Sequence, residues 1–499
     1  MHEQAAPTLN YSFAKENGLV LLELGERAHV GAREDAPPEA LIEARRALGV
    51  PLVIRPLTQT EFDKRLSETY TAAGLSSVDI ADDLEREDDL FSLIQDMPKT
   101  ADLLDTDNDA PIIRLINGLI AEALKLKASD IHVEPFEAKL SVRLRVDGVL
   151  QEIVALPARL APLLVSRIKV MARLDIAEKR VPQDGRISLS VAGKAVDVRV
   201  STLPSRHGER VVLRLLDKDQ GRFNIDDLGM SAELQERFRA ALAEPNGIIL
   251  VTGPTGSGKT TTLYAGISLL NEGSRNILTV EDPVEYALDG VGQTQVNAKV
   301  GMTFAAGLRA ILRQDPDVVM VGEIRDVETA QIAVQASLTG HLVLSTVHTN
   351  DAVAAITRLR DMGVEPFLLA STVKAILAQR LVRRLCTSCR VPAEPHAGER
   401  RVLGLEPDAP AAIFRAEGCA ACNQTGYQGR IGLYEMVAVD DELRRMIHDD
   451  ASEQELSEVA FRNAETLSQA GARLALTGVT SVEEVVRVCR PAGGSDGGV

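Results

Sequence analysis

A glycine-rich segment of eight residues constrains the fold of this chain more than any other feature. Residues Gly253–Thr260 read Gly-Pro-Thr-Gly-Ser-Gly-Lys-Thr and fit the phosphate-binding pattern G-x-x-x-x-G-K-[ST]. The apolar run Ile248–Thr252 comes directly before the segment, and Thr261–Leu270 after it has the character of a helix. A strand, a glycine loop and a helix in this order favour an α/β domain with a parallel sheet.

The same segment predicts a site for ATP and Mg²⁺. The glycines allow successive backbone N–H groups to point at phosphate oxygens, and the N-terminus of the helix adds partial positive charge. Lys259 is expected to bridge the β- and γ-phosphates, and the Thr260 hydroxyl is expected to bind Mg²⁺. The residues predicted to bind the nucleotide are Gly253, Pro254, Thr255, Gly256, Ser257, Gly258, Lys259, Thr260 and Thr261.

Three further runs predict parallel strands that are buried on both faces. They are short and almost continuously apolar, and they cover Ile277–Val280, Val318–Val321 and Leu342–Ser345. The carboxyl ends of parallel strands meet at one edge of a sheet, where such domains bind their ligand. We therefore expect the residues that follow these strands to face the phosphates.

Two glutamates follow these strands and are candidates for the chemistry. Glu281 directly follows the first strand, and Glu323 follows the second after one glycine. Phosphoryl transfer to water needs one carboxylate to orient the water and another to hold the hydration shell of Mg²⁺. His341 and His348 flank the third strand, and their spacing alone fits a structural role as well as a phosphate-sensing one.

The region before the glycine loop predicts a separate α+β domain. Apolar residues at helical spacing follow Pro111. Alternating patterns predict strands at 140–146, 196–200 and 211–215. The period of two places Arg199 opposite the valines of its strand, and it places Arg210 and Arg214 on one common face. We expect a sheet with a polar face that carries arginines.

Four of the five cysteines form two CxxC pairs. The pairs are Cys386 with Cys389 and Cys419 with Cys422, and 29 residues separate them. Four thiolates are a tetrahedral set for Zn²⁺, and they leave no open position for catalysis. We expect a structural zinc module, with unpaired core cysteines as the alternative, and we expect Cys489 to be a small apolar residue.

Composition divides the chain into four parts. Between Ser76 and Asp109 there are twelve Asp or Glu residues and two Lys or Arg residues, which favours a solvated linker or, alternatively, an acidic docking segment. The expected parts are a partner-docking domain at 1–75, the acidic linker at 76–109, the α+β domain at 110–225, and the P-loop ATPase domain at 226–499 with its zinc module at 386–430.

Composition also excludes several classes of protein. The net charge of −17 and the 3% of aromatic residues argue against a protein that coats nucleic acid. No apolar run is long enough to span a bilayer, the first residues lack the pattern of a secretory signal, and the sparse cysteines fit a reducing compartment. We expect a cytoplasmic protein, in which the basic stretch Arg380–Arg384 is a solvated or subunit-contacting face of a helix.

Four motifs resemble, in order, those of the secretion and type IV pilus ATPases. Gly253–Thr260 is similar to their P-loop, Val280–Glu285 to their Asp box, Asp315–Asp326 to their magnesium-binding strand, and Thr339–His348 to their His box. The cysteine pairs and the segment Gln183–Arg186 also fit. The resemblance covers roughly 111–488, and the length and the cysteine module make the type II secretion branch the most similar.

The resemblance implies a RecA-like ATPase that works as a hexameric ring. It implies hydrolysis of ATP to drive pseudopilus assembly, and hence the export of folded proteins. The N-terminal domain would dock on the cytoplasmic domain of the inner-membrane platform protein, so that the chain is peripheral at the cytoplasmic face of the inner membrane. No nucleic acid is expected.

The resemblance also implies roles for single residues. The implied catalytic set is Glu281, Glu323, His348, Arg199 and Arg214, with Arg210 beside the other two arginines at the nucleotide. The match to the His box favours a functional role for His341 as well as for His348. Arg309, Arg313, Arg325 and Arg430 lie where the family has arginines near the phosphates or at subunit interfaces.

Two alternatives remain open from the sequence. One is an assembly ATPase of type IV pili, which shares the chemistry and the four cysteines. The other is a nucleic-acid motor or a recruiting P-loop protein, for which the basic stretch Arg380–Arg384 is the main support.

Overall fold

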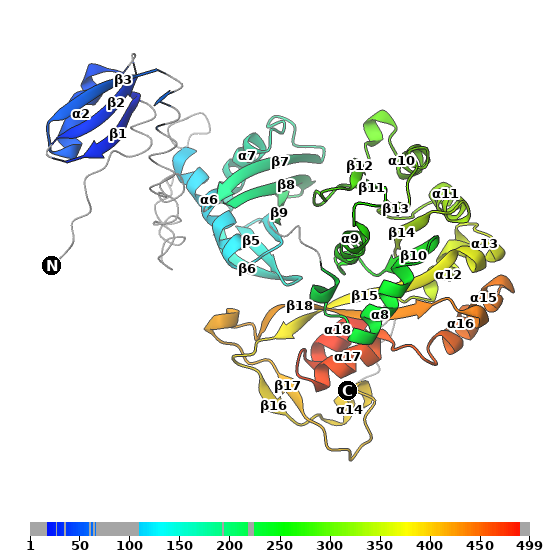
Figure 1. The fold of residues 1–499 in the computed structure, drawn as a ribbon. Helices are drawn as coiled ribbons and strands as arrows, with labels where there is room; N and C mark the ends of the chain where they lie inside the picture. The colour runs from blue at the N-terminus through cyan, green and yellow to red at the C-terminus, as the bar shows by residue number, and fades with distance from the viewer. Residues whose placement is uncertain are drawn as a thin grey trace. The chain divides into compact units, whose positions relative to one another are not determined.

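The computed structural model describes residues 17–25, 27–33, 36–58, 61–62, 65, 109–191, 194–217 and 224–489. The chain divides into two compact units, Met1–Asp217 and Lys218–Val499, and each is described here by itself (Figure 1). The acidic linker predicted at 76–109 lies outside the described residues except for its last position.

The first unit contains a small three-stranded sheet near the N-terminus. Its elements are β1 (Leu19–Leu24), β2 (Ala28–Arg33), α2 (Pro38–Leu48) and β3 (Leu52–Leu57). β1 pairs with β2 in antiparallel fashion, whereas β2 and β3 are parallel and α2 connects them. Helix α2 begins at a proline and ends at Gly49, whose φ of 71° is readily adopted by glycine.

The rest of the first unit is a six-stranded antiparallel sheet with two helices. Its elements are α6 (Asp109–Lys125), β4 (Asp130–Pro135), β5 (Lys139–Val146), β6 (Val149–Pro157), the 3₁₀ turn Ala158–Leu160, α7 (Ala161–Met171), β7 (Gln183–Val191), β8 (Lys194–Ser205) and β9 (Gly208–Asp217). The strand order is β6-β5-β4-β9-β8-β7. Apolar residues of α6 and α7 pack with one face of the sheet. Because side chains alternate between the two faces of a strand, the polar residues of these strands lie on the opposite face.

The second unit is built on a seven-stranded sheet. Its strands are β10 (Gly247–Thr252), β11 (Ile277–Glu281), β12 (Gly292–Gln295), β13 (Val318–Val321), β14 (Leu342–Val347), β15 (Val373–Leu385) and β18 (Tyr427–Ala438). The order is β12-β11-β13-β14-β10-β15-β18, and all neighbours are parallel except β15 and β18. The predicted parallel sheet of an α/β domain is confirmed.

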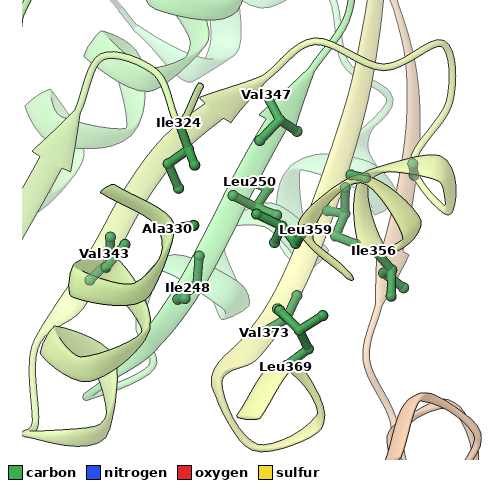
Figure 2. Packing of buried hydrophobic residues seen from close by; sticks show 14 of the residues in the cluster. Ile248, Leu250, Ile324, Ala330, Val343, Val347, Ile356, Leu359, Leu369 and Val373 are labelled. Atoms are coloured by element: carbon green, nitrogen blue, oxygen red, sulfur yellow. The ribbon is translucent and has the colours of Figure 1, made fainter. Parts of the chain in front are cut away.

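Helices cover both faces of this sheet. One face packs with the 3₁₀ turn Ile225–Leu228, α8 (Ala232–Leu242) and α9 (Lys259–Leu270). The other packs with α10 (Phe304–Ile311), α11 (Val327–Leu338), α12 (Ala354–Asp361) and α13 (Pro366–Thr372), and the 3₁₀ turn Ala298–Val300 precedes α10. Figure 2 shows this second layer, where Ile248 and Leu250 of β10 lie among side chains from the flanking strands and helices. Burial on both faces explains why the strands are apolar without alternation.

The C-terminal part of the second unit adds a small module and four helices. The module surrounds the cysteine pairs and contains β16 (Val391–Ala393), α14 (Ala397–Val402), β17 (Ile413–Arg415) and the 3₁₀ turn Ala420–Cys422. The helices are α15 (Asp441–His448), α16 (Glu453–Ala460), α17 (Leu467–Leu476) and α18 (Val482–Cys489). None of the helices in the described part of the chain is long and apolar enough to cross a membrane.

One expectation about the second unit is wrong. The basic stretch Arg380–Arg384 belongs to strand β15 and is not the face of a helix. Arg380 is buried, and Arg383 pairs with Glu484 at 2.7 Å. Residues of this stretch are good helix formers, but pairing with β10 and β18 overrides that preference. The stretch therefore gives no support to a nucleic-acid motor.

Glu484 forms a buried ion-pair network that joins β15 to α18. Its carboxylate accepts hydrogen bonds from the guanidinium of Arg383 and from that of Arg487, each at 2.7 Å. Burial alone would raise the pKa of Glu484, but the hydrogen bonds from the two arginines lower it to about 2. The network therefore stabilises the folded unit above the ordinary pKa of a glutamate, and the contribution is lost as the pH falls through about 2.

Replacement of this carboxylate should destabilise the second unit strongly. We expect Glu484→Gln to lower the free energy of unfolding at neutral pH by about 3 kcal/mol, because two arginines lose their buried counter-charge. Urea unfolding measures this change. The matched control is Glu483→Gln, next in the sequence but exposed, where we expect less than about 1 kcal/mol. Equal effects of the two substitutions would contradict a stabilising role for the network.

Candidate active site and metal centre

The glycine loop leaves the end of β10 and leads into α9. Gly253 has a φ of 147°, and a Cβ there would lie 2.4 Å from the carbonyl oxygen of Gln379. Gly258 has a φ of 89°, and a Cβ there would lie 2.7 Å from Nε2, the side-chain amide nitrogen of Gln379. Both positions therefore require glycine. Thr260 and Thr261 are exposed at the start of α9, where backbone N–H groups and hydroxyls are accessible to phosphates and Mg²⁺.

The Lys259 ammonium is turned toward the loop itself. Its Nζ donates to the carbonyl oxygens of Gly253 at 2.9 Å and of Pro254 at 3.0 Å. Burial lowers the pKa of Lys259 to about 8; nearby Glu323 opposes this shift and Arg380 adds to it. Because these carbonyls carry only partial charge, phosphate oxygens in their place would stabilise the ammonium better.

The strand ends bring Glu323 and His348 to the same edge as the loop. Glu323 follows β13, and its Oε2 lies 3.4 Å from the Nε2 of His348, which follows β14. The same oxygen lies 2.5 Å from the Nε of Arg325. The Glu323 side chain is 12% exposed, so it retains access from solvent. An accessible carboxylate at this edge is suited to hold the water shell of a metal ion.

Glu281 ends β11 at this edge but has a different environment. It is only 2% exposed, and its carboxylate accepts three hydrogen bonds from neutral side chains. Thr279 donates at 2.5 Å, Gln293 donates at 3.0 Å, and the hydroxyl of Tyr264 also donates. The sequence did not reveal these three donors, because they come from three different elements. The three hydrogen bonds hold the carboxylate in one orientation.

The two histidines of the predicted His box lie at opposite ends of β14. His341 precedes the strand, and its carbonyl accepts from the N–H of Gly247 at 3.2 Å at the edge away from the loop. A strand of six residues is about 20 Å long. Only His348 therefore lies beside Glu323, and His341 cannot reach the same ligand within this chain.

The predicted arginine-bearing face is present in the first unit. Arg199 on β8 lies opposite Arg214 on β9, and the valines of β8 point to the core. Arg214 donates to Asp130 at 2.9 Å, and Arg210 pairs with Glu134. The side chain of Arg214 is nevertheless 57% exposed, so its guanidinium remains available at the surface.

The acidic partners of these arginines were not predicted from the sequence. Asp130, His132 and Glu134 alternate with apolar residues along β4, and all three are buried in the polar face. Burial lowers the pKa of His132, and Arg145 adds to that shift. The alternation from Asp130 to Glu134 was the available signal, and it predicts a strand whose polar side chains face the arginines.

The other arginines implied by the resemblance lie in the second unit. Arg309 on α10 pairs with Glu328, and Arg313 donates to the carbonyl of Arg309 at 3.0 Å. Arg325 pairs with Glu323, as described above, and Arg430 lies on β18. Their phosphate or interface roles remain predictions.

The four cysteines of the two CxxC pairs come together in one cluster. Their sulfur atoms all lie within 4.8 Å of one another. The pairs Cys386–Cys419, Cys389–Cys422 and Cys419–Cys422 are separated by 3.9, 3.8 and 3.8 Å. A tetrahedral zinc ion with Zn–S bonds of about 2.3 Å requires sulfur atoms about 3.8 Å apart. The residues present therefore fit a zinc ion closely.

Backbone groups support an ionised thiol in this cluster. Burial would raise the pKa of Cys422, but the N–H groups of Cys419 and Gly426 donate to its sulfur and lower the pKa to about 6. Such N–H···S bonds stabilise thiolate ligands. The module also packs on α17 and α18 through Leu403 and Ile413, which indicates a structural role.

Comparisons with known proteins agree with this geometry. The sequence profile described as "Type II/IV secretion system protein" matches residues 105–487, and a second profile, for an N-terminal domain of "GSPII protein E", matches 8–70. The type II secretion system protein E of Pseudomonas aeruginosa is 57% identical over 488 residues, which cover 97% of each chain. The type II secretion system ATPase E of Vibrio cholerae is 53% identical over 490 residues, which cover 98% of this chain and 97% of that one.

The chain belongs to the type II secretion system protein E family. The solved structure of the pilus retraction motor PilT with bound ADP is 28% identical, covers 76% of this chain and 97% of its own, and gives a TM-score of 0.53. The fold class is therefore confirmed, and membership of a family of secretion ATPases implies ATP hydrolysis by this chain. Within the superfamily the type II secretion branch fits, and the pilus-assembly alternative does not.

Binding of nucleotide should be coupled to uptake of a proton by Lys259. The pKa of Lys259 is about 8 while its ammonium contacts the loop carbonyls, and it should rise when phosphates replace them. The affinity for ADP should therefore be constant below pH 8, where Lys259 is already protonated, and fall above it. At pH 8 we expect about half a proton to be taken up per ADP bound. Calorimetry at pH 8–9.5 in two buffers of different ionisation enthalpy measures this number.

The matched control is Lys259→Arg, whose side chain stays charged throughout this range. Its proton uptake should be close to zero, even if its affinity for ADP is reduced. The same proton uptake in both proteins would show that another group titrates.

The purified protein should contain about one zinc ion per chain. Cys419→Ser should lower the zinc content and the midpoint of thermal unfolding, because a structural zinc site contributes directly to folding. Cys489→Ser is the control, since this thiol lies outside the cluster and should leave the zinc content unchanged. A metal-free wild-type protein that unfolds at the same temperature as Cys419→Ser would refute the zinc site.

Proposed function

We propose that this chain is the cytoplasmic ATPase motor of a type II secretion system. It hydrolyses Mg-ATP to drive pseudopilus assembly and thereby the export of folded proteins across the outer membrane. The observation that carries the proposal is the near-complete coverage of relatives named type II secretion system protein E, at up to 57% identity among those described above. The grouping of Glu323 and His348 at the edge that also carries the glycine loop supports it.

The chemistry follows from the side chains at that edge. A bound Mg²⁺ would supply positive charge against the charge that develops on the phosphates in the transition state. Thr260 and the water shell held by Glu323 would retain the metal ion. Lys259 would exchange its carbonyl partners for phosphate oxygens, and Glu281 would orient the attacking water. His348 lies beside Glu323 and would contact the nucleotide bound at this edge of the sheet.

The arginines of the first unit supply the coupling in this proposal. In a hexameric ring, Arg199, Arg210 and Arg214 would reach the phosphates and stabilise the charge of the transition state. Hydrolysis would then depend on the position of the α+β domain. The pairs of Arg210 and Arg214 with buried carboxylates hold the guanidinium groups in place before they act.

The remaining parts provide attachment in this proposal. The domain at 1–75 docks on the cytoplasmic domain of the inner-membrane platform protein, which keeps the ATPase at the cytoplasmic face of that membrane. Residues 8–70 match a domain profile of their own, which supports a separate function for this part. The acidic segment 76–109 is its linker to the α+β domain at 110–225, which precedes the ATPase domain at 226–499 with its zinc module at 386–430.

The decisive measurement is phosphate release in the presence of the platform protein's cytoplasmic domain. We expect stimulation of several-fold in the full chain, and loss of stimulation but not of basal activity when the residues before Ser76 are removed. Glu323→Gln should reduce turnover about a hundredfold or more while ATP binding stays near wild type.

Glu453→Gln, an exposed residue of α16, serves as the control and should behave like the wild type. Failure of the platform domain to stimulate would argue against the secretion role. Loss of ATP binding in Glu323→Gln would instead show that the glutamate has been assigned the wrong task.

A further inference from the structure

A tyrosine on the P-loop helix reaches the carboxylate of Glu281. Tyr264 lies five residues after Lys259 on α9 and is fully buried. Its hydroxyl donates to the Oε2 of Glu281 and accepts from the N–H of Glu285 at 3.3 Å. Neither the composition nor a sequence motif predicts a role for Tyr264 at the site, because its position on the helix is that of an ordinary core side chain.

The direction of each hydrogen bond at Glu281 can be assigned. Gln293 uses its Oε1 to accept from the N–H of Leu288 at 2.8 Å, so its amide nitrogen faces Glu281 and Tyr286. Thr279 donates to the same carboxylate oxygen as Gln293. All three side chains donate, so the oxygens of Glu281 are the acceptors in each of these bonds.

The number of unoccupied acceptor positions limits how many further hydrogen bonds the carboxylate of Glu281 can accept. A carboxylate has about four lone-pair positions, and three are occupied by Thr279, Gln293 and Tyr264. About one position is left for a water molecule. Since Glu281 has so little exposure, the direction of that position is set by the three donors rather than by solvent.

We propose that Tyr264 is a positioning residue for ATP hydrolysis, whose hydroxyl donates to Glu281 and fixes the orientation of its carboxylate. The inference rests on the proposed role of Glu281 toward the attacking water. Lys259 and Tyr264 lie on one helix, so a single rigid element places both the phosphate-binding ammonium and the donor to the carboxylate. Burial raises the pKa of Tyr264, and the hydrogen bond to Glu281 adds to this, so the hydroxyl remains a donor at any working pH.

A purely structural role for Tyr264 can be separated from this one. Its ring packs edge-on against Tyr286 with centroids 6.4 Å apart and lies in the apolar core on that face of the sheet. Tyr264→Phe retains the ring and removes only the hydroxyl. Any change in kcat then reports the lost hydrogen bond and not lost packing.

The test is the measurement of kcat and KM for the full chain with Mg-ATP. Tyr264→Phe should lower kcat about tenfold and leave KM within about twofold of wild type, because the carboxylate loses one of the donors that orient it. Thr279→Val removes a second donor and should also lower kcat with little change in KM, which provides a second variant should the first fail to fold.

Tyr434→Phe is the matched control. Tyr434 is another buried tyrosine of the same core, but its hydroxyl donates to the carbonyl of Leu228 at 3.0 Å. Its kcat and KM should coincide with those of the wild type. A wild-type kcat in Tyr264→Phe would overturn the proposal, as would an equal loss of kcat in Tyr434→Phe.

Glu281→Gln separates failure of this inference from failure of the proposed function. If Glu281→Gln hydrolyses ATP at the wild-type rate, Glu281 has no catalytic role and both proposals about it are overturned. If Glu281→Gln is inactive and Tyr264→Phe matches the wild type, only the role of Tyr264 is wrong.

Discussion

The parallel register of four strands is the constraint on which the site depends. β11, β13, β14 and β10 are neighbours in the sheet and run in the same direction, so their carboxyl ends lie at one edge. The glycine loop, Glu281, Glu323 and His348 each follow one of these ends. Residues separated by up to about a hundred positions are thus brought together by backbone hydrogen bonds alone, before any side chain contributes.

The two carboxylates at this edge differ because their neighbours differ. Glu323 faces Arg325 and His348 and is partly accessible, whereas Glu281 is buried among neutral donors. A water shell around a metal ion needs an accessible anion, and a single water needs a fixed acceptor. The two environments therefore support the different tasks that we propose for these residues of the same type.

The sequence predicted those parts in which local pattern and burial agree. Four strands of the P-loop domain, β10, β11, β13 and β14, were found because burial on both faces leaves them continuously apolar, and Arg199 was placed correctly because β8 alternates. β15 was not found, since its residues favour a helix and only pairing with two neighbours makes it a strand. Tyr264 and Gln293 were missed for a related reason: their contact with Glu281 joins separate elements, and no spacing along the chain encodes it.

Strand β15 also connects the cysteine cluster to the nucleotide loop. Near its middle, Gln379 accepts a buried hydrogen bond from Thr262 of α9 at 2.7 Å, and its carbonyl lies against Gly253. The strand ends at Leu385, directly before Cys386, the first cysteine of the cluster, about 20 Å further along. A zinc ion bound by the four cysteines would stabilise the end of a strand whose other half supports the P-loop. A site with no open coordination position would then matter for ATP hydrolysis, because it would help to hold this strand in place.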